Sequence, residues 1–251
     1  MEVFGARRTS FGDAAEAYDA ARPSWPAGTV AWMLGSPPDS TVLRVLDLGA
    51  GTGKGTRVIA RMGHDVVAVE PSDQMRAALS TATGRLPAEV AARIDPRPGG
   101  AEQIPVEDGS LDAVTVFQAW HWFDEPVAAR ECARVLRPGG WLSMAWHLRD
   151  ESAPWSRELS DIVDRHEHLA DDEDAPALEG FGPAQTRVFD HVMRQSVEDL
   201  VLHASTWSFV AIRPDRETVL ERVRELGRRV AGDDGMVEIA MRTRCYRLPR
   251  L

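Results

Sequence analysis

A short run of glycines, Gly49-Ala-Gly-Thr-Gly-Lys-Gly55, is the part of the sequence whose residue types best suit ligand binding. Glycine lets the backbone approach a ligand without an intervening Cβ. A dinucleotide-binding loop needs Gly-x-Gly-x-x-Gly, and its third glycine would fall on Lys54 or Thr56 here. A Walker-type loop needs Ser or Thr directly after Gly-Lys, and Gly55 follows Lys54 instead. Neither phosphate-binding pattern is satisfied.

Two carboxylates beside this loop indicate another kind of ligand. Asp47 begins the pattern Asp-x-Gly-x-Gly-x-Gly, which Gly49, Gly51 and Gly53 complete. An acid at this position favours a cationic ligand and would repel a pyrophosphate. Glu70 follows about 20 residues further on, at the end of a predicted strand, where an acid commonly binds a ribose diol. The helix expected after Gly53 could direct backbone N–H groups towards a carboxylate. The pattern favours a ligand with an ammonium, a carboxylate and a ribose.

Aromatic residues gather after another predicted strand, in Gln118-Ala-Trp-His-Trp-Phe-Asp124. His121 is the best candidate for a general base, because an unperturbed histidine has a pKa of about 6.5. His147, after the following strand, is a second candidate. Alternatively, His121 and Trp122 form a pocket wall without proton transfer. Four tryptophans could line that pocket: Trp120, Trp122, Trp146 and Trp155. We expect only two of the four to do so, and assign Trp120 and Trp122 to the substrate.

The elements that must position these residues follow an alternating pattern of strands and helices. Short β-branched runs predict seven strands, at residues 42–48, 65–70, 93–97, 111–117, 141–147, 187–195 and 237–248. Amphipathic stretches predict helices at 53–62, after Ser72, at 126–136 and at 214–230. Such alternation favours an α/β fold with a doubly wound, mostly parallel sheet and helices on both faces. In such sheets ligands bind beyond the carboxyl ends of the strands, where these motifs lie.

Composition limits the class of protein. The chain has 251 residues and is expected to form one domain. Its net charge of −10 disfavours a nucleic-acid partner. No apolar run approaches the roughly 18 to 20 residues that a membrane span needs, and residues 1–10 do not resemble a signal peptide. The two cysteines lack metal-type spacing. We therefore expect a cytoplasmic protein with no membrane partner and no metal site.

The chain resembles the class I S-adenosylmethionine-dependent methyltransferases of the type 11 kind over most of its length. Val45-Leu-Asp-Leu-Gly-Ala-Gly-Thr-Gly53 resembles their donor-binding loop, and residues 100–105 and 108–112 resemble their adenine-binding segment. Residues 136–140 resemble the turn that ends a helix before the fifth strand in this family, and we assign them no chemistry. The resemblance implies a Rossmann-like fold, with S-adenosylmethionine as cofactor and S-adenosylhomocysteine as product. The residues assigned to the cofactor are Asp47, Gly49, Ala50, Gly51, Gly53, Glu70, Pro71, Met75, Ala101, Glu102 and Gln118.

Within this set the adenine contacts come from the resemblance alone. It implies that the backbone of Ala101 and a nearby acid contact the adenine. Many members of the family have that acid where Gly100 stands here. Glu102 could supply it, or could be an exposed loop residue.

The segments outside this core are also assigned by resemblance. Residues 11–23, with Tyr18 and Arg22, resemble a donor-covering segment of a subgroup that includes trans-aconitate and quinone-precursor methyltransferases. Tyr18 and Arg22 are expected to touch donor or substrate, unless they only pack a helix against the sheet. We predict a helical cap at 1–40, a donor-binding core at 41–149, a lid at 150–185, and strands and a helix completing the sheet at 186–251.

The expected reaction is an in-line displacement in which an acceptor attacks the sulfonium methyl. We expect a small-molecule acceptor, methylated on the oxygen of a hydroxyl or carboxylate; a carboxylate would need no base, so His121 would then be a wall residue. Carbon methylation of a quinone-type precursor is one alternative, and a donor-binding scaffold or cyclase is another. Gln118-Ala-Trp-His differs from the Asn/Asp-Pro-Pro-aromatic box of enzymes that methylate amino groups of nucleic acids.

Overall fold

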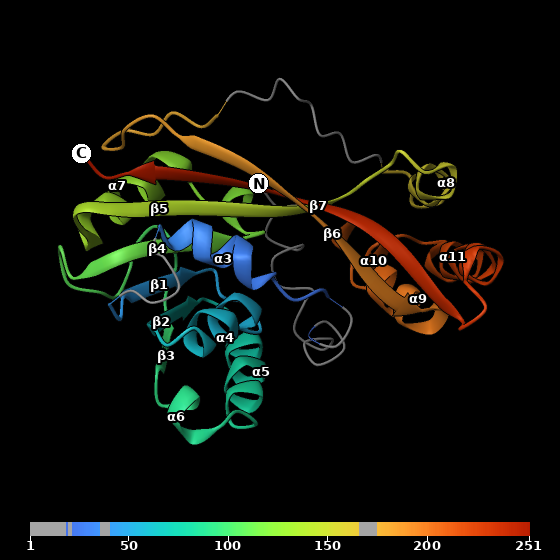
Figure 1. Cartoon of the computed structure of the whole chain (residues 1–251), viewed down its shortest axis with the longest axis horizontal. Coiled ribbons are helices and arrows are strands. Elements are labelled where there is room, and N and C mark those ends of the chain that lie inside the picture. The colour runs from blue at the N-terminus through green and yellow to red at the C-terminus, as the bar shows by residue number, and fades with distance from the viewer. Residues whose placement is uncertain (1–18, 20–21, 36–40, 166–174) are drawn as a thin grey trace. The chain divides into compact units, whose positions relative to one another are not determined.

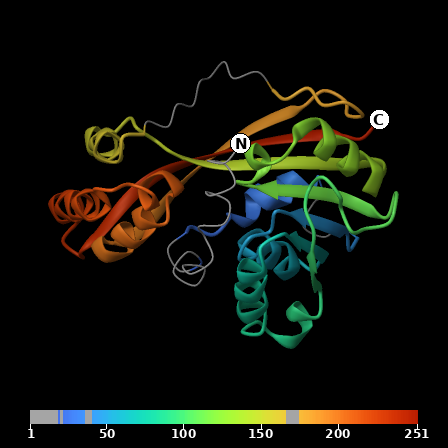
Figure 2. The same ribbon diagram turned by 180° about the vertical axis from the view of Figure 1, so that it is seen from behind.

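The computed structural model describes residues 19, 22–35, 41–165 and 175–251, and Figures 1 and 2 show it from opposite sides. The chain divides into two compact units. The first, which we call the core unit, comprises residues 24–146, 174–187 and 244–251. The second, the helical unit, comprises residues 1–23, 147–173 and 188–243. The predicted division into cap, core, lid and C-terminal part stays a prediction.

Seven strands form one sheet in the order β3-β2-β1-β4-β5-β7-β6. The pairs β1/β2, β1/β4, β2/β3 and β4/β5 are parallel. β7 runs antiparallel to β5, because Arg250 N donates to Gly140 O and Asp150 N to Ala240 O. The predicted mostly parallel, Rossmann-like α/β fold is confirmed. The strands are β1 (Arg44–Leu48), β2 (Asp65–Glu70), β3 (Ile94–Pro98), β4 (Leu111–Phe117), β5 (Leu136–Arg149), β6 (Gln185–Ser196) and β7 (Met236–Pro249).

Helices cover both faces of the parallel strands in the core unit. α7 buries Ala128, Cys132 and Val135 against Leu46 and its neighbours on one face. α3 lies on the other face, where Ser143 Oγ donates to Met33 O; α3 stands in front of the sheet in Figure 1, and α7 does so in Figure 2. The helical elements of this unit are α3 (Ala27–Leu34), α4 (Lys54–Arg61), α5 (Asp73–Thr83), α6 (Ala88–Ala91), the 3-10 turn η1 (Trp120–Trp122) and α7 (Glu125–Val135).

The helical unit has a separate hydrophobic core. Leu159 and Val163 pack there with Leu200, Val223 and other apolar residues, all of them buried. Its helices are α8 (Pro154–Val163), α9 (Val197–Ser205), α10 (Ser208–Ala211) and α11 (Arg216–Val230). In the part of the chain that the structure describes, no helix is long and apolar enough to cross a membrane.

The elements differ from the sequence-based expectations at a few places. β1 begins at Arg44 rather than at residue 42, since Val42 is half-exposed. β3 forms despite its two prolines because it lies at the sheet edge, where one side of the strand needs no partner. The predicted placement of Pro214 in the first turn of a helix is wrong: α11 begins at Arg216. The predicted lid region contains α8, which the sequence analysis did not anticipate.

Candidate functional site

The glycine loop between β1 and α4 owes its shape to backbone conformations that favour glycine. Gly49, Gly51 and Gly53 have φ values of 70°, 56° and 80°, in the left-handed region that other residues enter only with strain. The amides of Gly49 and Ala50 both donate to Val69 O, at 2.9 and 3.1 Å. The alternating glycines thus turn the chain sharply at the carboxyl end of β1 and attach it to the end of β2.

The three glycines differ in what surrounds them. A Cβ on Gly49 would lie 2.9 Å from the Cβ of Ala119, and one on Gly53 would lie 2.7 Å from Leu79 Cγ. Both glycines are therefore needed for close packing within the protein. A Cβ on Gly51 would meet no atom within 4 Å. The loop is consequently open at Gly51, where a ligand could approach the backbone.

Asp47 is a buried carboxylate beneath this loop. Its side chain is 1% exposed, and its Oδ2 accepts a 2.5 Å hydrogen bond from Thr56 Oγ1. Its Oδ1 is buried and has no hydrogen-bond partner among the described residues. Burial, assisted by the nearby Glu70 carboxylate and opposed by the hydrogen bonds from Thr56, raises the pKa of Asp47 to about 7. A donor or cation that reached Oδ1 would satisfy this acceptor and restore the ionised form.

Glu70, at the end of β2, connects the glycine loop to the start of the next helix. It is 8% exposed. Oε2 accepts from Gly51 N at 3.0 Å, and Oε1 accepts from Ser72 N at 2.9 Å. Each carboxylate oxygen has a second lone pair with which to accept from a diol. Pro71 is exposed beside Glu70, and Met75 is buried, its amide capped by Ser72 Oγ.

The segment before β4 supplies the predicted adenine-binding residues. Ala101 is 2% exposed within the hydrophobic core, whereas Glu102 is exposed. Oε1 of Glu102 accepts from Asp124 N at 3.3 Å, so its side chain lies towards the start of α7. A Cβ on Gly100 would lie 3.1 Å from Glu102 Oε2. The carboxylate of Glu102 is thus next to the position at which relatives carry an acid.

The end of β4 carries a strained residue and a group of aromatic side chains. Gln118 has a φ of 56° although it is not glycine, and such outliers are often found at functional sites. Trp120 is buried, and its Nε1 donates to Glu125 Oε2 at 2.9 Å. Exposed His121 lies 4.7 Å from Trp122 between ring centroids, and its Nδ1 accepts a long, 3.5 Å hydrogen bond from Trp146 Nε1.

Three of the predicted site residues, Arg22, His147 and Trp155, lie outside the core unit. Tyr18 is not among the described residues. Arg22 and His147 belong to the helical unit, where Arg22 donates to Thr206 Oγ1 at 3.1 Å. His147 is buried, shares a 2.7 Å hydrogen bond with Thr243 Oγ1, and has a pKa that burial lowers to about 3. A ring of such low basicity is a poor general base near neutral pH. Trp155 packs against the helical unit's core.

Two residues that shape this site, Thr56 and Arg57, were not predicted from the sequence. Thr56 holds Asp47, and buried Arg57 donates from Nη1 to Thr52 O at 2.6 Å, so a cation lies beside the loop. Both sit in the first turn of α4, whose N-terminus was expected to face a ligand. A check for polar residues on the inner face of that turn could have found them.

Comparison with known proteins identifies the family to which the chain belongs. A methyltransferase-domain family model matches residues 46–144. The chain is 42% identical over 220 residues to the uncharacterized methyltransferase Rv3342 of Mycobacterium tuberculosis, covering 86% of this chain and 85% of that one. It is 33% identical over 153 residues to the 2-methyl-6-phytyl-1,4-hydroquinone methyltransferase of Synechocystis, covering 58% and 44% of the two chains.

Among solved structures, the putative type II methyltransferase of Anaeromyxobacter dehalogenans has a similar fold. It superposes with a TM-score of 0.63 at 24% identity, covering 91% of this chain and 97% of that one. The chain belongs to the class I S-adenosylmethionine-dependent methyltransferases. It is therefore an enzyme, a transferase, and S-adenosylmethionine is its methyl donor.

Proposed function

We propose that this methyltransferase acts on a small molecule and places the methyl group on an oxygen atom, most readily that of a carboxylate. The observation that carries the proposal is the state of the His121 ring. The indole N–H of Trp146, 3.5 Å from Nδ1, favours the tautomer of the neutral ring that bears its proton on Nε2. It can then donate a hydrogen bond through Nε2 and cannot take a proton there. A carboxylate suits such a donor and needs no base to become nucleophilic.

The residues of the core unit fit the methyl donor. Asp47 has a buried acceptor, Oδ1, that an ammonium could satisfy. Glu70 can accept from a ribose diol, and Gly51 leaves the loop backbone accessible. Ala101 and Glu102 would flank the adenine. S-adenosylmethionine, when bound, supplies an electrophilic methyl group on sulfur.

The acceptor would meet the aromatic group formed after the end of β4 and by Trp146 within the adjacent strand β5. His121, Trp122 and Trp146 lie there within the core unit, and Trp146 stands edge-on to Tyr246 with 6.0 Å between ring centroids. Flat apolar walls exclude water and hold an acceptor in place, which is the main source of rate enhancement in a displacement that needs no acid or base. Trp122 and Trp146 are the two tryptophans that we assign to this wall.

A macromolecular acceptor is less compatible with the chain's charge. The net charge of −10 opposes binding to a phosphate backbone. The strand end Gln118-Ala-Trp-His lacks the box used by enzymes that methylate amino groups of nucleic acids. Both observations disfavour a nucleic-acid acceptor and are consistent with a small molecule.

Carbon methylation of a quinol ring is the second candidate. It is supported by the similarity to the hydroquinone methyltransferase of Synechocystis. The aromatic wall would also suit a quinol ring. That reaction needs a phenolate to activate the ring, so His121 would have to accept a proton, in the opposite tautomer to the one described above.

The test is to identify the atom that receives the methyl group. Purified protein is incubated with methyl-labelled donor and three acceptor sets: carboxylic acids, phenols and alcohols, and quinols. Mild alkali releases the label as methanol from a methyl ester, whereas ethers and carbon-methyl products retain it. Carbon-13 spectra then separate the ethers from the carbon-methyl products. Label retained at ring carbon would overturn the proposal, and alkali-labile label would support its carboxylate form.

A further inference from the structure

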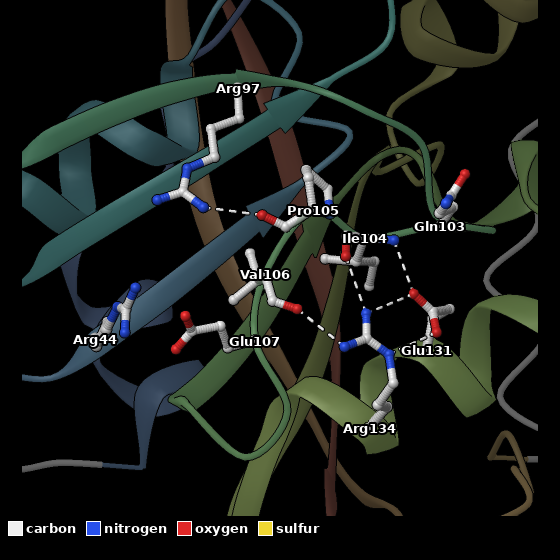
Figure 3. Close-up of a pocket in the computed structure, with 9 residues that line it drawn as sticks. All are labelled: Arg44, Arg97, Gln103, Ile104, Pro105, Val106, Glu107, Glu131 and Arg134. Carbon is white, nitrogen blue, oxygen red and sulfur yellow. Dashed lines mark hydrogen bonds and ion pairs between the residues drawn. The ribbon is translucent and has the colours of Figure 1, made fainter.

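The segment that carries Ala101 and Glu102 is held by buried apolar residues and by charged side chains rather than by regular secondary structure. Between residues 100 and 106 its internal backbone hydrogen bonds are few: Gln103 N donates to Gly100 O at 3.4 Å, and Val106 N donates to Ile104 O at 2.8 Å. A segment with so few backbone bonds needs other contacts to adopt one conformation. Figure 3 shows which side chains provide them.

Two residues of α7, Arg134 and Glu131, bind this segment; we call this pair the fork. Arg134 donates from Nη2 to Ile104 O and from Nη1 to Val106 O, both at 2.9 Å. Glu131 Oε2 accepts from Ile104 N at 2.8 Å. Arg134 also donates to Glu131 from Nε at 2.7 Å and from Nη2 at 2.8 Å. One ion pair therefore holds two carbonyls and one amide of the segment.

The electrostatics of the fork keep both of its members charged. The hydrogen bonds from Arg134 lower the pKa of Glu131, and those to Glu131 and Asp108 raise the pKa of Arg134. Hydrogen bonds with a charged partner are shorter and about twice as strong as neutral ones. The fork is thus a fixed feature of the protein over the ordinary pH range.

Apolar packing covers only one side of the segment, since Gln103, Pro105 and Glu107 are exposed. A cavity of about 670 Å³ opens beside it, as Figure 3 shows, and the fork and the segment are part of its lining. Across this cavity Arg97 of β3 donates from Nη1 to Pro105 O at 2.8 Å. Buried apolar side chains anchor the segment to the core, and hydrogen bonds from Arg134, Glu131 and Arg97 fix its backbone on the side that adjoins this cavity.

We propose that Arg134, held by Glu131, is a positioning residue for the adenine half of the methyl donor. It would act by fixing the backbone between Gly100 and Val106, so that Ala101 and Glu102 keep the geometry that recognises an adenine. This inference rests on the proposed placement of the adenine beside Ala101 and Glu102. Arg134 itself need not touch the ligand.

If Arg134 positions this segment, its replacement should weaken recognition of the adenine and leave the other contacts with the donor unchanged. Arg134→Ala removes two carbonyl contacts and leaves Glu131 without its cation, so the segment should sample several conformations. Affinity for S-adenosylhomocysteine should fall roughly tenfold, about the effect of losing one charge-assisted hydrogen bond. The KM for the donor should rise similarly, with kcat at saturating donor nearly unchanged.

The test compares S-adenosylhomocysteine with S-inosylhomocysteine, in which an oxygen replaces the amino group of the adenine. Calorimetry gives the adenine preference of the wild-type protein as the dissociation constant of S-inosylhomocysteine divided by that of S-adenosylhomocysteine. Arg134→Ala should reduce that ratio at least threefold, and Arg134→Lys, which can keep one carbonyl contact, should reduce it less. Arg130→Ala is the matched control, because Arg130 is an exposed arginine one turn earlier on the same helix.

Each outcome has a defined meaning. If the ratio stays at its wild-type value in Arg134→Ala, or if both ligands weaken equally, the positioning role is wrong. If Arg134→Ala does not fold, Arg134→Lys decides by the same ratio. A wild-type protein that binds the homocysteine product but shows no preference for adenine would instead contradict the proposed adenine placement, independently of Arg134.

Discussion

Replacing Asp47 with asparagine should stabilise the protein at high pH while weakening its binding of the methyl donor. The folded protein raises the pKa of this carboxyl from 3.8 to about 7. Between those values the unfolded chain has the ionised form and the folded protein the protonated one, so stability falls as pH rises from about 4 to about 7. A shift of about 3 units corresponds to about 4 kcal/mol.

Above pH 7 the full cost of about 4 kcal/mol is present in the wild type and absent in Asp47→Asn. Asparagine keeps an acceptor for Thr56 but buries an amide N–H, which costs about 1 kcal/mol. Urea unfolding at pH 8, without donor, should therefore show Asp47→Asn more stable by about 3 kcal/mol. At pH 4 the difference should nearly vanish. A variant that is less stable than wild type at pH 8 would refute the reasoning.

The same carboxyl should make donor binding depend on pH. With a pKa of about 7, the ionised fraction of Asp47 rises from about 1% at pH 5 to about 50% at pH 7. If the ionised form binds the ammonium, affinity should rise roughly 50-fold over that interval, where an α-amino group stays protonated. Asp47→Asn should bind at least tenfold more weakly at pH 7 and show no such slope, which calorimetry at several pH values measures.

Three further substitutions test the loop and the strand end. Gly51→Ala should lower donor affinity at least tenfold, because the alanine Cβ would occupy the open space beside the loop and would stand at an unfavourable φ. Fluorescence titration with the donor measures this affinity. Gln118→Gly should raise the unfolding free energy by up to about 1 kcal/mol by relieving a φ of 56°, while activity falls; lower stability would show that there is no strain to relieve. His121→Ala should reduce turnover but spare donor affinity, and an unchanged kcat across the pH range would remove His121 from the mechanism.

The sequence was sufficient to predict the parallel part of the sheet because hydrophobic runs and glycine turns mark it locally. β2 and β4 were predicted at their observed bounds, and the helix predicted after Ser72 is α5, which Ser72 caps. Local signals also existed for helices that were missed. Pro154 stands at the first turn of α8, and Ser196 caps α9 by accepting from Asp199 N at 3.1 Å.

The candidate site was predicted less completely, because part of it depends on contacts between distant residues. The alternating glycines of the loop indicate backbone with positive φ from their residue type alone. Glu70 is recognisable from its distance along the chain from this loop. The pKa of Asp47, in contrast, depends on how deeply the fold buries it, and the neutrality of His147 depends on its burial as well. No local pattern could have indicated that Arg134 reaches the carbonyls of Ile104 and Val106.

The two hydrogen bonds of Glu70 have a consequence for attempts to alter the donor. Because Glu70 binds the amides of Gly51 and Ser72 before any ligand arrives, the loop is already ordered and little conformational entropy is lost on binding. The residue proposed to recognise the ribose therefore also contributes to the order of the glycine loop. An engineered enzyme that replaced Glu70 to admit a modified ribose would also release the glycine loop. Redesign for synthetic donors would therefore do better to begin at the exposed Glu102 than at the carboxylate that holds the loop in place.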